Sequence, residues 1–353
     1  MAFTRTISKS WYEFIINDNA VPGKNCTLYK THKSGIPVRL LTTGCNTAIE
    51  NLCRFIEAHT YPLVENLPCR IKDTAHLLEI IDDINEVPLP DDAILVSFDI
   101  INMFPSISNK QGIHCVKKAL DSRKNKKPPT SCIIEALEIS LSSNNSTFNN
   151  QHLVQTDGTA QGAPNSCSYA DLATMEIDKK VIQSTRRRFQ ELQIYKKYRD
   201  DVFAVWFGDP YKIDDFLCFL NSLDTNLKFT LEVGLFFQVV SDFTPLQLFS
   251  FFHVTINNCN NPSVKGRVFE LLPGGIFTMW TGKISDVDNF LETLNSIDDS
   301  LRFSVQIGKH KLRILDLEIK LNNHHLEHTV YRKPTNSQMY LDYSSCHRHV
   351  KTA

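Results

Sequence analysis

The chain has 353 residues, of which 42% are hydrophobic and 22% are charged. This composition excludes wholesale disorder and a collagen-like or low-complexity chain, and the length fits one large domain or two to three ordinary ones. The formal net charge is −1, with 38 Lys and Arg against 39 Asp and Glu. Bulk charge therefore gives no argument for a nucleic-acid partner, and any basic surface must be local.

The cysteine pattern and the start of the chain indicate a compartment. Ten cysteines are scattered without a CxxC pair, and residues 1–11 lack the apolar core of a signal peptide. We therefore expect an intracellular protein, nuclear or cytoplasmic, with thiols as small core residues. The most apolar stretch, residues 235–256, contains Asp242 and Pro245, so we expect no membrane span. The histidines between residues 324 and 349 have no clean zinc spacing.

Hydrophobic periodicity predicts helices over residues 46–61 and 74–84. Residues 94–98 form an apolar run typical of a buried strand, and Asp99 ends it. Two strand-like runs, residues 194–198 and 202–207, flank Asp200 and Asp201, which predicts a hairpin with both aspartates at its turn.

Two segments are strongly basic: residues 110–127 and residues 179–199 each hold seven or more Lys and Arg against one acid. Such runs are commonly solvated helix faces. Because they flank the acidic motifs, contact with a nucleic-acid backbone is the alternative interpretation.

The chain also repeats itself. Residues 202–234 and 276–308 align without a gap at an offset of 74, and 13 of 33 positions are identical. Each copy predicts a strand, a turn, an amphipathic helix and a second strand. Asp200 and Asp201 precede the first copy, whereas two glycines precede the second.

The aspartates form a candidate metal site. If the strand ending at Asp99 pairs beside the hairpin, Asp99, Asp200 and Asp201 converge at one sheet edge, since adjacent strands lie about 4.8 Å apart. Repulsion between like charges would then demand divalent cations, and oxygen ligands suit two Mg²⁺ or Mn²⁺ ions that support phosphoryl transfer. The alternative is two unrelated surface turns.

Three segments resemble reverse transcriptase motifs and follow the order found in that family. Residues 97–107, SFDIINMFPSI, are similar to the first catalytic-aspartate motif. Residues 159–166, TAQGAPNS, are similar to the Gly-Pro loop of the nucleotide pocket, and residues 198–201, YRDD, to the Tyr-x-Asp-Asp box. Residues 28–39 are similar to the basic fingers motif, and the tail motifs at residues 315–347 resemble Penelope-like retroelements in particular.

The resemblance implies an α+β chain with a right-hand polymerase fingers–palm architecture, an antiparallel palm sheet and a partial thumb, truncated before the family's GIY-YIG nuclease. We expect fingers and an N-terminal remnant at residues 1–90, a palm with the catalytic motifs at 91–234, an unassigned insert at 235–275, a duplicated palm segment at 276–322 and the start of a thumb at 323–353.

The resemblance also implies an RNA-directed DNA polymerase that transfers a dNTP to a primer 3′-hydroxyl on an RNA template with a DNA primer. The implied catalytic residues are Asp99, Asp200 and Asp201, which bind two Mg²⁺ or Mn²⁺ ions together with the Ile100 carbonyl. The implied nucleotide-binding residues are Lys33, Arg39, Phe104, Gln161 and Gly162, with the Phe104 ring excluding the ribose 2′-hydroxyl. The implied nucleic-acid contacts are Lys196, Lys197, Tyr198 and Arg199.

Two features depart from the family pattern. Arg199 stands where the family usually has a small or apolar residue, and the 74-residue duplication supplies a second helix and strand after the hairpin. We hypothesise that two partial element copies, or a translated non-coding stretch, are joined; this hypothesis fails if both copies pack side by side in one sheet with residues 235–275 ordered. A catalytically inactive relic of the same fold and an unrelated metal-dependent nuclease or phosphotransferase are the alternative functions.

Overall fold

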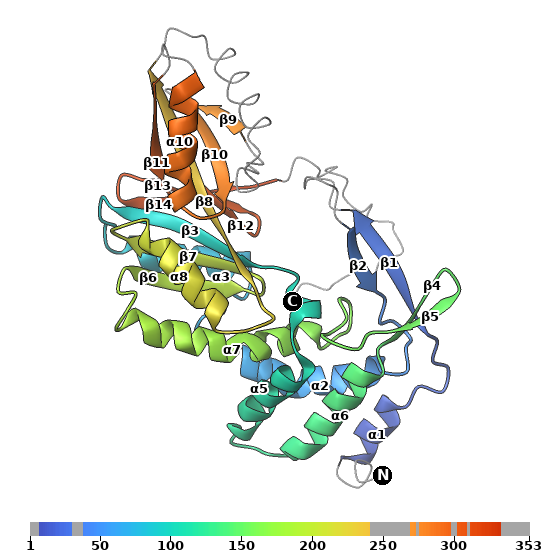
Figure 1. Cartoon of the computed structure of the whole chain (residues 1–353). Helices are drawn as coiled ribbons and strands as arrows, with labels where there is room; N and C mark the ends of the chain where they lie inside the picture. Colours follow the sequence, from blue (N-terminus) through green and yellow to red (C-terminus); the bar gives the residue numbers. More distant parts are fainter. Residues whose placement is uncertain are drawn as a thin grey trace, which may run out of the picture.

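The computed structural model describes residues 7–29, 38–240, 269–272, 275–297, 302–308 and 311–332. The chain starts with α1 (Lys9–Ile15), whose first turn is capped by the Ser8 hydroxyl. A four-stranded sheet follows, in which β1 (Gly23–Tyr29) lies between β2 (Val38–Thr42) and β4 (Asn145–Phe148), and β4 pairs with β5 (Gln151–Val154) (Figure 1).

The central sheet carries the aspartate motifs. β3 (Ala93–Ile100) lies between β7 (Asp201–Phe207) and β8 (Phe229–Val240), with β6 (Leu192–Tyr198) beyond β7, and all of these neighbours are antiparallel. The far half of β8 pairs with β10 (Gly275–Thr281) and β11 (Arg302–Ile307), and β10 pairs with β9 (Phe269–Leu272). The predicted buried strand and hairpin are thus confirmed as β3 and as β6 with β7.

Helices cover this sheet and build the part of the fold below it (Figure 1). The predicted helices are confirmed as α2 (Glu50–Val64) and α3 (Thr74–Asn85). The others are α4 (Met103–Ser106), α5 (Asn109–Asp121), α6 (Thr130–Ser142), α7 (Ser166–Thr185), α8 (Lys212–Ser222) and α10 (Ser285–Ile297).

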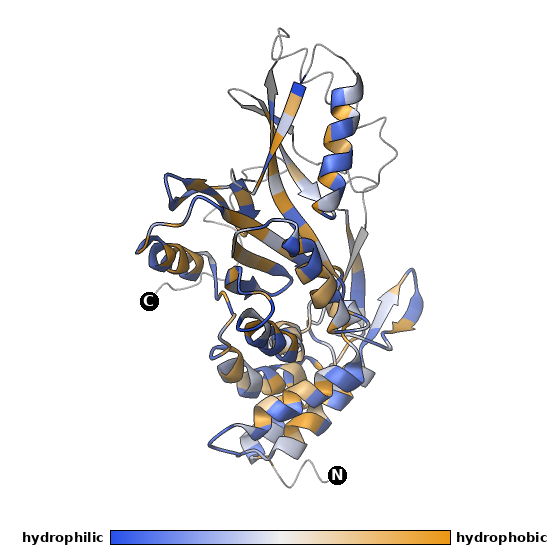
Figure 2. Cartoon of the chain, turned by 60° about the vertical axis from the view of Figure 1, so that its left-hand side comes forward, coloured by the Kyte–Doolittle hydropathy of each residue, from blue (hydrophilic) through white to orange (hydrophobic). Residues whose placement is uncertain are grey.

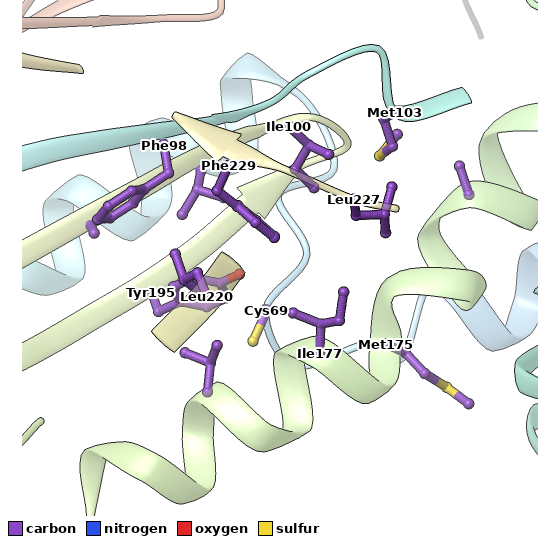
Figure 3. Packing of buried hydrophobic residues seen from close by; sticks show 14 of the residues in the cluster. Cys69, Phe98, Ile100, Met103, Met175, Ile177, Tyr195, Leu220, Leu227 and Phe229 are labelled. Carbon is purple, nitrogen blue, oxygen red and sulfur yellow. The ribbon is translucent and has the colours of Figure 1, made fainter. Parts of the chain in front are cut away.

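The core lies between α7 and the central strands. Ile177 of α7 points toward a layer that includes Phe98 and Ile100 of β3 and Phe229 of β8 (Figure 3). Hydrophobic residues run along the strands of the central sheet, and the helices in view carry both hydrophobic and hydrophilic residues (Figure 2). Burying this apolar layer fixes β3 and, with it, the position of Asp99 at the strand's end.

The two sequence copies have the same structure, β7–α8–β8 and β10–α10–β11. In each copy the indole of the tryptophan donates to a backbone carbonyl three residues later at 3.0 Å, from Trp206 and Trp280. In each copy, an asparagine side chain donates to the carbonyl and accepts from the N–H of a phenylalanine at the start of the last strand. The pairs are Asn221 with Phe229 and Asn295 with Phe303. Both copies pack in one sheet, which meets the first of the two conditions against the hypothesis of joined partial copies. The second condition was that residues 235–275 are ordered, and of these, residues 241–268 and 273–274 lie outside the described residues.

The second copy extends the same seven-stranded sheet and meets β3 and the first copy at Gly308. Gly308 N donates to Gly234 O at 2.7 Å, and Leu95 N of β3 donates to Gly308 O at 3.0 Å. β3 pairs with β8 up to Val233, so β3 contacts the first copy and then Gly308. The offset of 74 residues is therefore the length of chain between Gly234 and Gly308, which are equivalent positions in the two copies.

A small antiparallel sheet closes the described chain: β12 (Lys311–Ile314), β13 (Leu317–Asn322) and β14 (His325–Val330). The expected boundary between palm segment and thumb, at residue 322, falls in the turn between β13 and β14. Residues 325–330 therefore pair with the preceding strand, while the tail motifs beyond residue 332 lie outside the described residues.

Candidate active site

The sheet register brings the aspartate motifs together. Asp99 at the end of β3 lies directly opposite Asp201 at the start of β7. Directly opposite residues of antiparallel strands share a face, with Cβ atoms about 4.5–5.5 Å apart. Asp200 occupies the adjoining two-residue turn, and its carbonyl accepts a 3.0 Å hydrogen bond from Ile100 N. The Thr230 hydroxyl donates to the Asp99 carbonyl at 3.3 Å, which ties β8 to the same place.

The turn itself has an unusual backbone. Arg199, its first residue, has φ +57°, a region that non-glycine residues rarely adopt. A hairpin of this length favours positive φ at the first turn position because it matches the strand twist. A non-glycine residue keeps this strained backbone conformation only where the surrounding structure holds it in place.

These residues suit a hard divalent cation in their chemistry. Carboxylates and a backbone carbonyl are the ligands that Mg²⁺ prefers. Within the described parts of the chain, however, no group of three or more His, Cys, Asp and Glu side chains is gathered to hold a metal ion. Mg²⁺ in phosphoryl-transfer sites is commonly held by one or two carboxylates plus substrate phosphates, so the Asp99–Asp201 pair fits a site completed by substrate.

The first motif continues into a tight turn that places Phe104. Asn102 has φ +48° and precedes the short helix α4, in which Phe104 is half-buried against the main core. Thr159 N donates to the Phe104 carbonyl at 3.0 Å. A Cβ on Gly158 would stand 2.5 Å from that carbonyl, so glycine lets the second motif approach the first.

The Gly-Pro loop is bound to the small sheet. Thr42 N, at the end of β2, donates to the Gln161 carbonyl at 3.1 Å. Gly162 has φ +124°, and a Cβ there would lie 2.3 Å from the Thr42 carbonyl, so no larger residue fits without displacing β2. Of the implied triphosphate ligands, Arg39 lies on the same strand, β2, with its side chain outside what is described, and Lys33 lies outside the described residues.

The structure corrects the role expected for Lys197. Its side chain is 4% exposed, and its ammonium lies 2.7 Å from Asp178 Oδ2 and 2.6 Å from Thr174 Oγ1, both on α7. The Tyr195 hydroxyl donates to the other Asp178 oxygen at 3.2 Å. A buried ion pair of this kind holds β6 on α7 and cannot reach a phosphate.

The neighbouring candidates point elsewhere. Lys196, one residue along the strand, donates to the Pro68 carbonyl at 3.0 Å near the surface. The Arg199 guanidinium lies over the Tyr198 ring, 5.1 Å from its centroid. Both residues are half-buried, and their contact with nucleic acid stays a prediction.

Sequence reasoning missed a group of acids beside the turn. Glu57 of α2 accepts a 2.8 Å hydrogen bond from Ser168 of α7, and Asp171 of α7 is buried with 8% exposure. Burial raises the pKa of both carboxyls. Asp171 follows the Gly-Pro loop in the helix that the resemblance includes, although no role was expected for it, and Glu57 lies in no motif.

The comparisons with known proteins show a likeness of fold. No family model and no curated protein matches the chain. A solved apo telomerase from Candida tropicalis, truncated from its C-terminal domain, is similar over 87% of this chain and 54% of that one, with a TM-score of 0.51 and 10% identity. The chain therefore spans about half the length of that telomerase chain. Another apo telomerase from Candida tropicalis gives a TM-score of 0.45 at 10% identity, over 59% of this chain and 42% of that one. A BmCPV RNA-dependent RNA polymerase gives 0.44 at 10% identity, over 65% and 22%.

At this identity the first likeness shows the fold alone. The chain has a polymerase-like fold of helices and antiparallel sheets, as expected in coarse form from the sequence. No helix in the described ranges is both long and apolar enough to span a bilayer.

Proposed function

We propose that the chain is the fingers–palm part of an RNA-directed DNA polymerase of a Penelope-like retroelement. It adds dNTPs to a primer 3′-hydroxyl along an RNA template. The observation that carries the proposal is the register that sets Asp99 opposite Asp201 beside the Asp200 turn. The ordered sequence motifs and the telomerase-like fold support it.

Each residue has a place in this proposal. Asp99, Asp200 and Asp201, with the Ile100 carbonyl, would hold two Mg²⁺ or Mn²⁺ ions. Such ions, when bound, stabilise charge on the attacking and leaving oxygens of phosphoryl transfer. The paired strands of the protein hold the carboxylates in position on one face of the sheet. Positioning of this kind, with electrostatic stabilisation, supplies most of the rate gain in phosphoryl transfer.

The nucleotide lies, in this proposal, against the loop and the aromatic gate. Phe104 presents a ring that leaves no room for a ribose 2′-hydroxyl. Gln161 and Gly162 line the pocket beside β2, and Lys33 and Arg39 bind the triphosphate through charge-assisted hydrogen bonds.

The basic runs supply a local surface for nucleic acid in an otherwise neutral chain. Lys118 and Lys179 both pair with Glu176 at 2.8 Å, which joins the C-terminal halves of α5 and α7. Around them the following side chains are exposed: Lys117, Lys124, Lys126, Lys127, Lys180, Arg186, Arg187 and Arg188. We infer backbone contact here; replacing the three arginines by alanine should lower the salt slope of RNA affinity by roughly 0.7–0.9 per lost contact.

The test is primer extension on poly(rA)/oligo(dT) with Mg²⁺ or Mn²⁺. We expect extension by the chain, and a fall of at least about 10³-fold in Asp200→Ala, because that carboxylate acts in the transition state. Asp91→Asn is the matched control, since its side chain, just before β3, is 96% exposed. Hydrolysis of nucleic acid without any dNTP would instead support a nuclease.

Sugar selection tests the gate separately. Phe104→Ala should admit ribonucleotides and narrow the preference for dNTPs by about 10–100-fold, since it removes a steric exclusion. The ratio of kcat/KM for dTTP and UTP measures this. An unchanged ratio in an active variant would assign Phe104 to core packing.

A catalytically inactive relic is the second candidate. The absence, among the described residues, of a gathered group of three metal-binding side chains favours it, as does a cation at position 199. No extension by a folded chain that still binds RNA would support the relic.

A further inference from the structure

A small polar pocket lies beside the aspartate turn, between α2, α7 and the β6–β7 hairpin. Its volume is about 90 Å³, which is room for one planar guanidinium group. Its lining includes Glu57 and Asp171, which we call the acidic wall, together with Arg199 of the turn and Tyr198 at the end of β6.

The acidic wall is incompletely satisfied. One Glu57 oxygen, Oε2, is buried without a hydrogen-bond partner among the described residues, while the other accepts from Ser168. Asp171 is 8% exposed, and the positive charges of Lys197, Arg199 and Arg70 oppose the rise that burial causes in its pKa. A cation stabilises a buried carboxylate, and the pocket beside Glu57 and Asp171 has room for a cationic group.

Two arginines face this wall, each over its own tyrosine. Arg70 lies over the Tyr61 ring at 5.6 Å from the centroid, and Arg199 lies over Tyr198 at 5.1 Å. Arg70 is fixed because its segment pairs with β6, with Ile71 N donating to the Lys197 carbonyl at 2.7 Å. Arg199 is instead carried by the turn that holds Asp200.

We propose that Arg199 is a positioning residue, whose guanidinium tethers the Asp200–Asp201 turn to the Glu57 and Asp171 carboxylates of α2 and α7. Attraction between the Arg199 guanidinium and these carboxylates would offset part of the backbone strain at φ +57°. The tether also links the catalytic turn to α7, whose N-terminus carries the Gln161–Gly162 loop. This inference rests on the proposed polymerase function for its kinetic test.

The kinetic experiment compares Arg199→Met, which keeps length and loses charge, with Asp171→Asn and the double variant. We expect each single variant to lower kcat for dNTP addition about 10–100-fold, as a displaced catalytic group does. The double variant should lose no more, and Arg199→Lys should recover part of the rate. The salt slope of primer–template affinity should stay unchanged. Arg199→Gly, which relieves backbone strain, should fail to restore the rate.

The opposite result identifies a different role. If Arg199→Met lowers that salt slope by about 0.9, the value for one lost phosphate contact, and Asp171→Asn leaves kcat unchanged, Arg199 binds nucleic acid and the tether is wrong.

A second measurement does not need activity. In urea unfolding, the effects of Arg199→Met and Asp171→Asn should be non-additive, because the two side chains share one interaction. Additive effects would overturn the tether. A wild-type chain that extends no primer would overturn the proposed function and leave this unfolding test valid.

Discussion

Replacing Lys197 by methionine isolates the buried ion pair between β6 and α7. The Lys197 ammonium lies 2.7 Å from Asp178, and the two side chains are 4% and 7% exposed. Methionine keeps the volume but leaves the Asp178 carboxylate buried with the Tyr195 hydroxyl as its remaining donor among the described side chains. Breaking one half of a buried pair costs about 3–5 kcal/mol.

The measurement is the urea midpoint followed by circular dichroism. With a slope near 3 kcal/mol/M, the loss corresponds to a midpoint lower by about 1–1.7 M. Lys196→Met is the matched control, since it removes the same group one residue away, where the ammonium contacts the exposed Pro68 carbonyl. That variant should stay within about 0.5 kcal/mol of the parent.

A second variant separates charge from packing. Lys197→Met combined with Asp178→Leu replaces the pair by apolar side chains, and it should regain most of the lost stability because no lone charge remains buried. If Lys197→Met instead matched Lys196→Met in stability and weakened primer–template binding, the buried ion pair would be refuted and the original nucleic-acid role restored.

Three further predictions follow from the geometry. Gly162→Ala should lower kcat/KM for dNTPs at least about tenfold, because its Cβ would stand 2.3 Å from a β2 carbonyl at φ +124°; unchanged kinetics would mean that the loop is not in the pocket. Deletion of residues 235–308 should give a folded chain that retains primer extension, measured by calorimetry and by the same assay; loss of folding would show that the second copy is needed by the palm. Native protein at pH 8 should react with a thiol reagent at the exposed Cys218 within minutes, while burial raises the pKa of Cys53 and Cys69 to about 12 and protects them; mass mapping decides this.

The sequence was sufficient where local pattern and burial agree. The run before Asp99 is apolar at consecutive positions, which requires a strand buried on both faces, and the structure buries Ala93 to Phe98. The hairpin was equally visible, since the strand-like runs 194–198 and 202–207 lie three residues apart, although Asp201, expected in the turn, is the first residue of β7. Together these predict that Asp99 and Asp201 meet, although the register that sets them opposite each other depends on pairing across a hundred residues.

The error at Lys197 came from reading a basic run as a surface. Strand residues alternate between faces, so Lys197 shares its face with the buried Tyr195 while Lys196 points outward. The matching signal lay on α7, where Thr174 and Asp178 are four residues apart on the buried side of the helix. A polar pair on an inward face predicts a partner, but which strand supplies it is decided by tertiary packing.

The duplication leaves the strand pairing around the aspartates intact. β8 continues past Gly234 in the same sheet, and the chain comes back to Gly234 at Gly308, its equivalent in the second copy, where Gly308 N donates to Gly234 O at 2.7 Å. Gly308 then accepts from Leu95 of β3, so the strand that ends at Asp99 finds its next neighbour just where an uninterrupted first copy would continue. The second copy in turn packs on the first, since the Asp214 carboxylate accepts hydrogen bonds from Ile284 N and Ser285 N at 2.8 and 2.9 Å at the start of α10. The second copy therefore extends the sheet while β3 and β7 keep the register that sets Asp99 opposite Asp201, so the duplication by itself gives no reason to expect an inactive site.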